Sequence, residues 1–169
     1  MKPPLSAQMP DICDVVIEDE RWSALLLEPL VEGAARKALK IAGLAGEDWE
    51  IAILACSDAR IATLNADFRD KPSSTNVLSW PAEGLGADAP GGVPMVAAGP
   101  ELGDIAIAFE TCAREAQEQG IAIADHVAHL IIHAVLHLLG YDHITDADAE
   151  LMEGLEIKAL ASMGIENPY

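Results

Sequence analysis

Basic and aromatic side chains are scarce in this sequence. Its 169 residues contain 10 Lys and Arg against 28 Asp and Glu, which gives a formal net charge of −18 at pH 7. Aromatic residues make up only 4% of the chain. The composition therefore argues against a basic surface that coats nucleic acid and against a platform of rings that stacks bases. A small, local site for a phosphate remains compatible with it.

Features of secreted and membrane proteins are also missing. The cysteines, Cys13, Cys56 and Cys112, are odd in number and form no C-x-x-C pair, so free thiols in a reducing cytoplasm are the simplest interpretation. The first residues lack the apolar core of a signal peptide. The most apolar stretch, 121–139, contains Asp125 and four histidines, which lipid would oppose. We therefore expect a cytoplasmic protein that has no membrane partner, with 121–139 as a buried helix.

The length of the chain predicts one domain over residues 1–169, and hydrophobic periodicity and cap residues predict its elements. The order of elements, β-α-β-α-β-β-α-α-α, is typical of an α+β or mixed α/β domain. We expect about four strands in one mixed sheet, packed with helices around a central histidine-bearing helix. Strands are expected at 15–17, 50–55, 75–80 and 102–109. Helices are expected at 22–42, 58–68, 110–119, 123–139 and 145–163. The Gly-, Pro- and Ala-rich segment 81–100 is expected to be a mobile loop.

The acidic residues are unevenly distributed. Residues 82–110 carry five acids and no base, and residues 140–169 carry seven acids and one base. Residues 56–81 carry three of each sign, and residues 31–43 carry one acid and three bases. An anionic ligand should therefore meet the 31–43 face or the 56–81 loop.

All five histidines lie within eighteen positions, and the first four are spaced three or four apart, which places them on one helix face. These are His126, His129, His133, His137 and His143. Four neutral imidazoles on an apolar stripe would each need a hydrogen-bond partner, and protonated neighbours would repel. The cluster therefore favours metal binding over four separate core histidines.

The spacing His133-x-x-x-His137-x-x-Gly140-x-x-His143 is the specific signal. Two histidines at i and i+4 can direct both rings at one ion, and Gly140 lets the chain leave the helix so that His143 returns as a third ligand. Three imidazoles with one open position are typical of a catalytic zinc site, although nickel and copper also suit them. His129 lies about 6 Å further along the helix, so His133 and His137 are the better pair.

The same spacing occurs in metzincin peptidases, but those enzymes carry a general-base Glu directly after the first histidine. Ala134 occupies that position here. A zinc peptidase is therefore the weaker hypothesis, because the group that activates the zinc-bound water is missing. His126 and His129 are expected in the core or as partners of the ligands. Asp142 either orients a ligand imidazole or caps the turn.

Three motifs resemble the YbeY endoribonuclease family, also called rRNA maturation factors. Residues 133–143 are similar to its histidine signature, with Ala134 where Gly is usual, a small change that a helix tolerates. Residues 64–81, which include Lys71, resemble its N-x-x-[YF]-R…T-[DN]-V-L-S-[FW]-P segment. Residues 102–105 resemble its L-G-D-I strand, and residues 152–164 fit its C-terminal run. The first fifty residues match only in their strand–helix pattern.

This resemblance implies a zincin-like site with one zinc ion held by His133, His137 and His143, and a functional arginine at Arg69. It implies a single-strand-specific, metal-dependent endoribonuclease that acts in rRNA maturation, notably at the end of 16S rRNA, and in ribosome quality control. The expected partners are single-stranded rRNA and the pre-ribosomal small subunit. Because the surface is acidic, basic ribosomal proteins are also expected.

Arg69 also has an interpretation of its own, since an arginine near a metal can clamp a phosphate and stabilise the charge of the transition state. The alternative is a surface arginine paired with Asp67 or Asp70. Ser73, Ser74 and Thr75 could add hydroxyl contacts. Asp104 either faces the metal-bearing helix or starts a turn, and Trp80 is either a core residue or a base-stacking one.

We therefore expect phosphodiester cleavage, with either a metal-bound water or the ribose hydroxyl as the attacking group. A non-catalytic, zinc-stabilised ribosome assembly factor is the main alternative.

Overall fold

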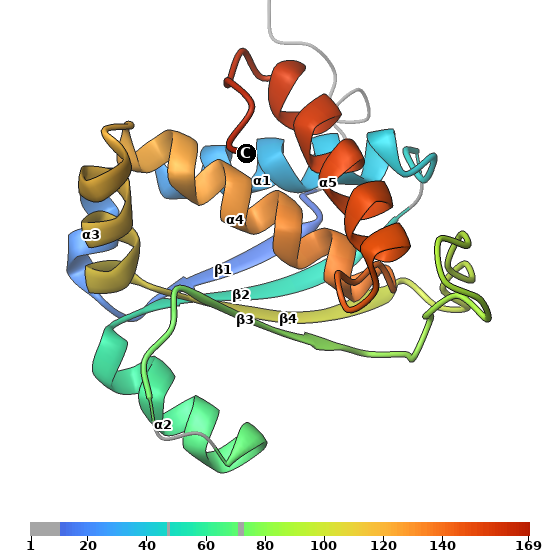
Figure 1. Ribbon diagram of the computed structural model, residues 1–169. Helices are drawn as coiled ribbons and strands as arrows, with labels where there is room; N and C mark the ends of the chain where they lie inside the picture. The colour runs from blue at the N-terminus through green and yellow to red at the C-terminus, as the bar shows by residue number, and fades with distance from the viewer. Residues whose placement is uncertain (1–10, 47, 71–72) are drawn as a thin grey trace, which may run out of the picture.

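In the computed structural model, a four-stranded mixed sheet lies between helices on its two faces (Figure 1). The structure describes residues 11–46, 48–70 and 73–169. Lys71 and residues 1–10, to which the sequence predictions also refer, lie outside this range. The strands are β1 (Cys13–Ile17), β2 (Glu50–Cys56), β3 (Val77–Pro81) and β4 (Glu101–Ala108). Their order is β1-β2-β4-β3. The first three in that order are parallel, whereas β3 runs antiparallel to β4 at the edge.

Helices cover the two faces of this sheet unequally. They are the 3₁₀ helix η2 (Glu20–Ala24) and the α-helices α1 (Leu27–Ile41), α2 (Asp58–Arg69), α3 (Phe109–Gln119), α4 (Ile123–Leu138) and α5 (Asp146–Ala161). Figure 1 shows α1, α4 and α5 on one face and α2 alone on the other. The predicted α+β single domain, with its four-stranded mixed sheet and histidine-bearing helix, is therefore confirmed.

The alternation of side chains in β2 explains this asymmetry. Ile51 and Ile53 are buried under the helices, whereas Glu50 and Ala52 point to the other side and are exposed. Each isoleucine removed from water contributes roughly 1.5–3 kcal/mol, so the main core forms between the sheet and α1, α4 and α5. The predicted buried helix at 121–139 is α4, and most of its residues are buried.

The prediction of one helix over 22–42 is wrong, because η2 and α1 are separate. Pro29 explains the break. A proline in the interior of a helix has no N–H to donate and clashes with the preceding turn, whereas the first turn tolerates it. The helix α1 therefore begins at Leu27, two residues before Pro29. The other predicted elements differ from the observed bounds by about two residues.

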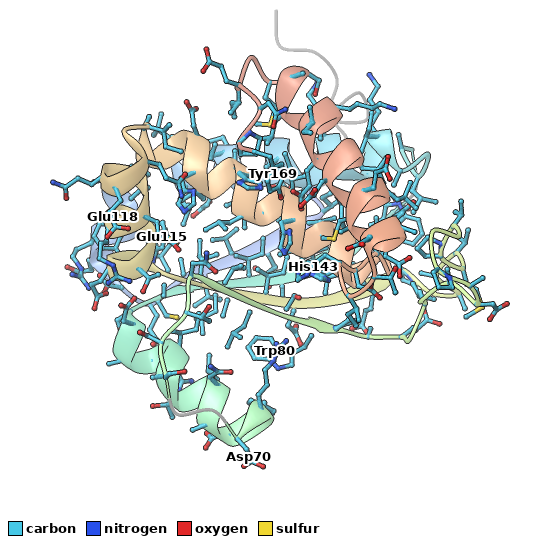
Figure 2. The ribbon with its side chains drawn as sticks, viewed as in Figure 1. Asp70, Trp80, Glu115, Glu118, His143 and Tyr169 are labelled. Atoms are coloured by element: carbon cyan, nitrogen blue, oxygen red, sulfur yellow. The ribbon has the colours of Figure 1, made fainter. Side chains whose placement is uncertain are left out.

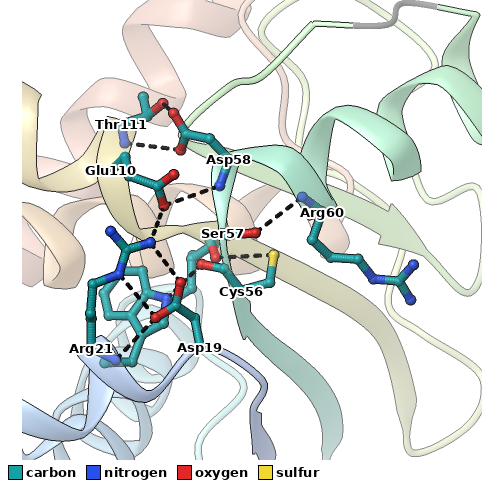
Figure 3. A network of polar contacts seen from close by, with 10 residues as sticks. Asp19, Arg21, Cys56, Ser57, Asp58, Arg60, Glu110 and Thr111 are labelled. Atoms are coloured by element: carbon teal, nitrogen blue, oxygen red, sulfur yellow. Dashed lines mark hydrogen bonds and ion pairs between the residues drawn. The ribbon is translucent and has the colours of Figure 1, made fainter.

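Two helices that follow neighbouring strands cap each other (Figure 3). The Asp58 carboxylate, at the start of α2, accepts from the Thr111 backbone N–H at 3.0 Å and from its hydroxyl at 2.8 Å. The Glu110 carboxylate, at the start of α3, accepts from the Asp58 N–H at 3.3 Å and from Arg21 at 2.6 Å. These contacts satisfy N–H groups that a helix start otherwise leaves unpaired.

The segment 82–100 contains no helix or strand. A hydrogen bond from the Gly91 N–H to the Asp148 carboxylate, at 2.8 Å, joins this segment to α5. A second hydrogen bond, from the Met95 N–H to the Leu85 carbonyl at 2.9 Å, lies within the segment. Its predicted mobility stays a prediction.

No single helix in the described part of the chain is long and apolar enough to cross a membrane. The pair α3 and α4 together reaches that length and composition, but the two helices meet at a bend of 115°.

Candidate metal centre

Three imidazoles converge at the end of α4. His133 and His137 lie one turn apart on the helix, and their Nε2 atoms are 3.0 Å apart. The chain then turns back and brings the His143 ring centroid to 5.2 Å from that of His137 and 5.5 Å from that of His133. One nitrogen of each ring lies within 4.8 Å of the other two. The structure therefore brings together the three histidines that the spacing predicted.

Gly140 makes this return of the chain possible. Its φ of +105° is a conformation that side-chain-bearing residues rarely adopt. A Cβ here would also lie 2.7 Å from the backbone of Leu85. The next N–H, of Tyr141, bonds back to the Leu136 carbonyl at 3.0 Å and ends the helix. The position of His143 thus depends on a glycine and on the adjacent 82–100 segment.

Glu156 of α5 reaches the histidine cluster through His133 of α4. Its side chain is fully buried, and its Oε1 atom forms a short hydrogen bond with Nδ1 of His133. A carboxylate accepts, so Nδ1 carries the proton and Nε2 keeps a free lone pair. Burial raises the pKa of Glu156, but hydrogen bonds from His129, His133 and Tyr169 outweigh it and lower the pKa to about 2. The group is thus a carboxylate at neutral pH.

His137 has the charge state that a metal ligand needs. Burial, together with the neighbouring His133 and His143, lowers the pKa of His137 to about 4, so this ring is neutral at pH 7. Tetrahedral zinc with ligands at about 2.0–2.1 Å places their nitrogens roughly 3.3 Å apart. The 3.0 Å between the Nε2 atoms of His133 and His137 is close to this spacing, and His143 offers a nitrogen within 4.8 Å of both. The donor set therefore suits one such ion.

A pocket of about 510 Å³ opens beside the cluster, between the edge strand β3 and α4. His133 and His137 line it from α4, Ser79 lines it from β3, and Arg69 lines it from the end of α2. Tyr169, labelled with His143 and Trp80 in Figure 2, also contributes to its wall. The pocket thus combines the candidate metal ligands with a permanent cation.

Arg69 is held over β3 by the end of α2. Its Nη2 donates to the Ser79 carbonyl at 2.8 Å, and Asn65 donates to the Ser73 carbonyl at 3.0 Å, which ties the helix to the following loop. Among the described residues, no ion pair joins Arg69 to a carboxylate, so the alternative pairing with Asp67 or Asp70 is wrong.

The other histidines of α4 lie outside the cluster of His133, His137 and His143. His126 is buried and bonds to Glu115 of α3 at 3.0 Å, and Glu115 also accepts from Asn76 at 2.9 Å. His129 bonds to Glu156 at 3.2 Å. Through these contacts α4 is anchored to α3, to α5 and to the start of β3.

The structure bears on three alternatives that the sequence left open. Asp142 caps the turn, because its side chain accepts from the Ile144 N–H at 3.1 Å. Asp104 lies inside β4 and so starts no turn. It is exposed and lines a groove on the face of the sheet opposite α4, so it does not face that helix. Trp80 lines that same groove and packs edge-on against Phe68 at 5.7 Å. Trp80 is partly buried against the smaller core cluster, and both its base-stacking role and the hydroxyl contacts of Ser73, Ser74 and Thr75 stay predictions.

Sequence reasoning assigned no role to Glu156, Tyr169 or Glu115. A signal existed for Glu156, because it is an acid among the buried positions of α5, such as Met152 and Ala159. A buried charge requires partners. Tyr169 had no such signal, since periodicity says nothing about an isolated aromatic residue beyond the last helix.

The fold and site define an α+β protein with a three-histidine candidate metal centre beside an arginine-bearing pocket. The model of the Endoribonuclease YbeY family matches residues 16–164, and the chain belongs to this family. Endoribonuclease YbeY of Ruegeria pomeroyi is 57% identical over 164 residues, which cover 92% of this chain and 96% of the relative. Endoribonuclease YbeY of Dinoroseobacter shibae is 53% identical over 161 residues, which cover 92% of this chain and 89% of the relative. The family prediction is thus confirmed.

One solved structure has the same fold. The solution structure of TM1509 from Thermotoga maritima superposes with a TM-score of 0.55 at 18% identity and covers 90% of this chain and 91% of that one.

Proposed function

We propose that this protein is an endoribonuclease that cleaves single-stranded rRNA during maturation of the small ribosomal subunit, including the end of 16S rRNA. One zinc ion, held by His133, His137 and His143, serves the reaction. The observation that carries this proposal is the shared pocket, which places Arg69 and two of these imidazoles around one volume of about 510 Å³. Membership of the Endoribonuclease YbeY family supports RNA as the substrate.

The chemistry divides between the ion and the chain. When bound, zinc polarises a phosphoryl oxygen or lowers the pKa of a water molecule to about 7. Arg69 binds the scissile phosphate through the planar fork of its guanidinium and stabilises the charge that develops on it. The pocket volume lies in the range of roughly 300–1,000 Å³ typical of small-ligand sites.

The peptidase hypothesis finds no support in the site. Ala134, next to His133, is buried against the core and offers no group that could accept a proton from a water molecule. A general base is the element that a metzincin-type peptidase requires there.

We also assign the protein to the cytoplasm and to basic ribosomal partners. The cysteines are free, and burial raises the pKa of Cys56 and of Cys112 to about 12, so both remain thiols in a reducing compartment. The net charge of −18 favours a basic partner.

Nuclease assays with purified protein test the proposal. The assays compare end-labelled single-stranded RNA with the same sequence as a duplex, and the metal content of each sample is measured by elemental analysis. We expect single-strand cleavage that His133→Ala and Arg69→Ala abolish or strongly reduce. Arg60→Ala is the matched control, since Arg60 is an exposed arginine on the same helix that pairs with Glu18 at 3.5 Å. Equal cleavage by all four proteins would indicate a contaminating nuclease and overturn the proposal.

The non-catalytic assembly factor is the alternative outcome. Arg69→Ala leaves the candidate metal ligands in place, so a strain that carries it separates the two functions. Unprocessed 16S rRNA ends in that strain support the nuclease, whereas fully mature ends favour the assembly factor.

A further inference from the structure

The strongest feature outside the ligands and Arg69 is a buried carboxylate. Glu156 is the only acid with a fully buried side chain among the residues that the structure describes. It extends from α5 into the layer between α5 and α4. An ionised group in such a place is costly unless each of its oxygens is compensated, and an apolar residue would pack there without that cost. Its presence therefore calls for a role besides packing.

Both Glu156 oxygens accept hydrogen bonds, from histidines of α4 and from Tyr169 near the end of the chain. Oε1 accepts from Nδ1 of His133. Oε2 accepts from the Tyr169 hydroxyl and contacts Nε2 of His129 at 3.2 Å. The carboxylate thus joins one candidate metal ligand to a tyrosine that lies 13 residues beyond it in sequence.

Tyr169 reaches this network because the segment after α5 folds back over α4 (Figures 1 and 2). Its ring packs edge-on against His129, with the centroids 5.6 Å apart, and it lines the pocket together with His133. Its hydroxyl lies 3.4 Å from Nε2 of His129. The ring and the hydroxyl are therefore both fixed, and the hydroxyl fixes one oxygen of Glu156 in turn.

We propose that Glu156 and Tyr169 are positioning residues of the metal centre. Glu156 holds His133 in the tautomer with its proton on Nδ1, which keeps the Nε2 lone pair directed at His137 and His143, and Tyr169 keeps the Glu156 carboxylate in that orientation. This inference rests on the proposed function only in taking the three histidines as metal ligands. A carboxylate behind a ligating imidazole fixes its orientation and raises its basicity, and the loss of such a partner typically weakens metal binding 10- to 100-fold.

Zinc titrations of the purified, metal-free full chain against a chelating indicator test this inference. Glu156→Gln keeps the shape and removes the charge, and we expect its zinc dissociation constant to rise about 10- to 100-fold. Tyr169→Phe keeps the ring contact with His129 and removes the hydroxyl, and we expect a smaller rise of several-fold. Glu150→Gln, an exposed acid on the same helix, is the matched control and should leave the constant unchanged.

Nitrogen NMR of the histidine rings adds a measurement that a purely structural role would not change. In the metal-free wild-type protein at neutral pH, we expect His133 to carry its proton on Nδ1. In Glu156→Gln we expect a shift toward the Nε2–H form.

Each result decides the inference. Wild-type zinc affinity in both variants, or an Nε2–H proton on His133 in the wild-type protein, would overturn it. Should Glu156→Gln fail to fold, Tyr169→Phe still decides through both measurements. A wild-type protein that binds zinc but cleaves no RNA would contradict the proposed function and leave this inference standing on the titration.

Discussion

Arg69 donates a hydrogen bond from Nη2 to the Ser79 carbonyl, 2.8 Å away, and this contact holds its guanidinium over the edge strand in the pocket that His133 lines. A guanidinium offers five N–H donors in a planar fork, so one backbone contact leaves donors for a phosphate. The contact also explains why the last residue of α2 belongs to a site built mainly on α4.

The first prediction concerns this arginine. Arg69→Ala should lower the rate of RNA cleavage about 10²- to 10³-fold, the usual cost of losing one donor to a developing charge, without changing the bound zinc. Arg69→Lys should recover little, because an ammonium cannot bind a phosphate bidentately. Single-turnover cleavage with elemental analysis measures both. If Arg69→Ala cleaved RNA at the wild-type rate, a role of Arg69 in the reaction would be excluded.

The second prediction uses the exposure of His143. This ring is exposed, so His143→Ala should fold as stably as the wild-type protein when both are metal-free. Zinc at a hundred times its dissociation constant should stabilise the wild-type protein by about 2.7 kcal/mol and the variant far less. Thermal unfolding with and without zinc measures the difference. Ile144→Ala, at an 86% exposed neighbour, should keep the full zinc response, and an equal response in His143→Ala would exclude His143 as a ligand.

Gly140→Ala should destabilise the protein by about 1–3 kcal/mol and weaken zinc binding. The reason is that alanine is strained at φ +105° and its Cβ would lie 2.7 Å from the Leu85 backbone. Gly33→Ala in α1, where no atom lies within 4 Å of the added Cβ, should instead stabilise it by about 0.5–1 kcal/mol. Urea denaturation of both variants measures these opposite signs. Equal effects would show that the turn is not restricted.

Acid should destabilise the metal-free protein in two steps. The pKa of His137 falls from 6.5 when unfolded to about 4 when folded, so the unfolded state binds the proton first. The contribution of His137 to the free energy of unfolding is therefore fully present above pH 6.5, and it declines by on the order of 3 kcal/mol as the pH falls to 4. The lowered pKa of Glu156 adds a second loss between pH 4.5 and about 2. Urea denaturation at each pH measures the free energy of unfolding. The variant His137→Gln should lack the first of the two losses. A wild-type stability that is constant from pH 6.5 to 4 would contradict it.

The reciprocal caps give a prediction on stability alone. Asp58→Ala removes the two carboxylate oxygens that accept hydrogen bonds from Thr111, so it should lower the free energy of unfolding by about 1–2 kcal/mol. Asp67→Ala, at an exposed acid of the same helix, should change stability by less than about 0.5 kcal/mol. Thermal unfolding compares the two variants. The same melting temperature for both would show that the cap between α2 and α3 is not stabilising.

The elements of the fold follow from local patterns along the chain. The alternation of buried Ile51 and Ile53 with exposed Glu50 and Ala52 is typical of a strand, and the Ser57 and Thr145 side chains cap helices close to the predicted positions. The break before α1 was missed because apolar periodicity continues through 22–42 and outweighed the effect of Pro29.

The sequence by itself determined the candidate metal ligands, since the geometry of one helix and one glycine turn relates His133, His137 and His143 through their local spacing. Only the tertiary structure decided what surrounds them. Arg69, Glu156 and Tyr169 come from three separate segments, and no local spacing relates them to α4. Packing of α5 on α4, and the crossing of α2 at the edge of β3, brings them to the site. Long-range packing sets such relationships, so the spacing of residues predicted neither Glu156 nor Tyr169, and Arg69 was named through the family resemblance rather than through its distance from the histidines.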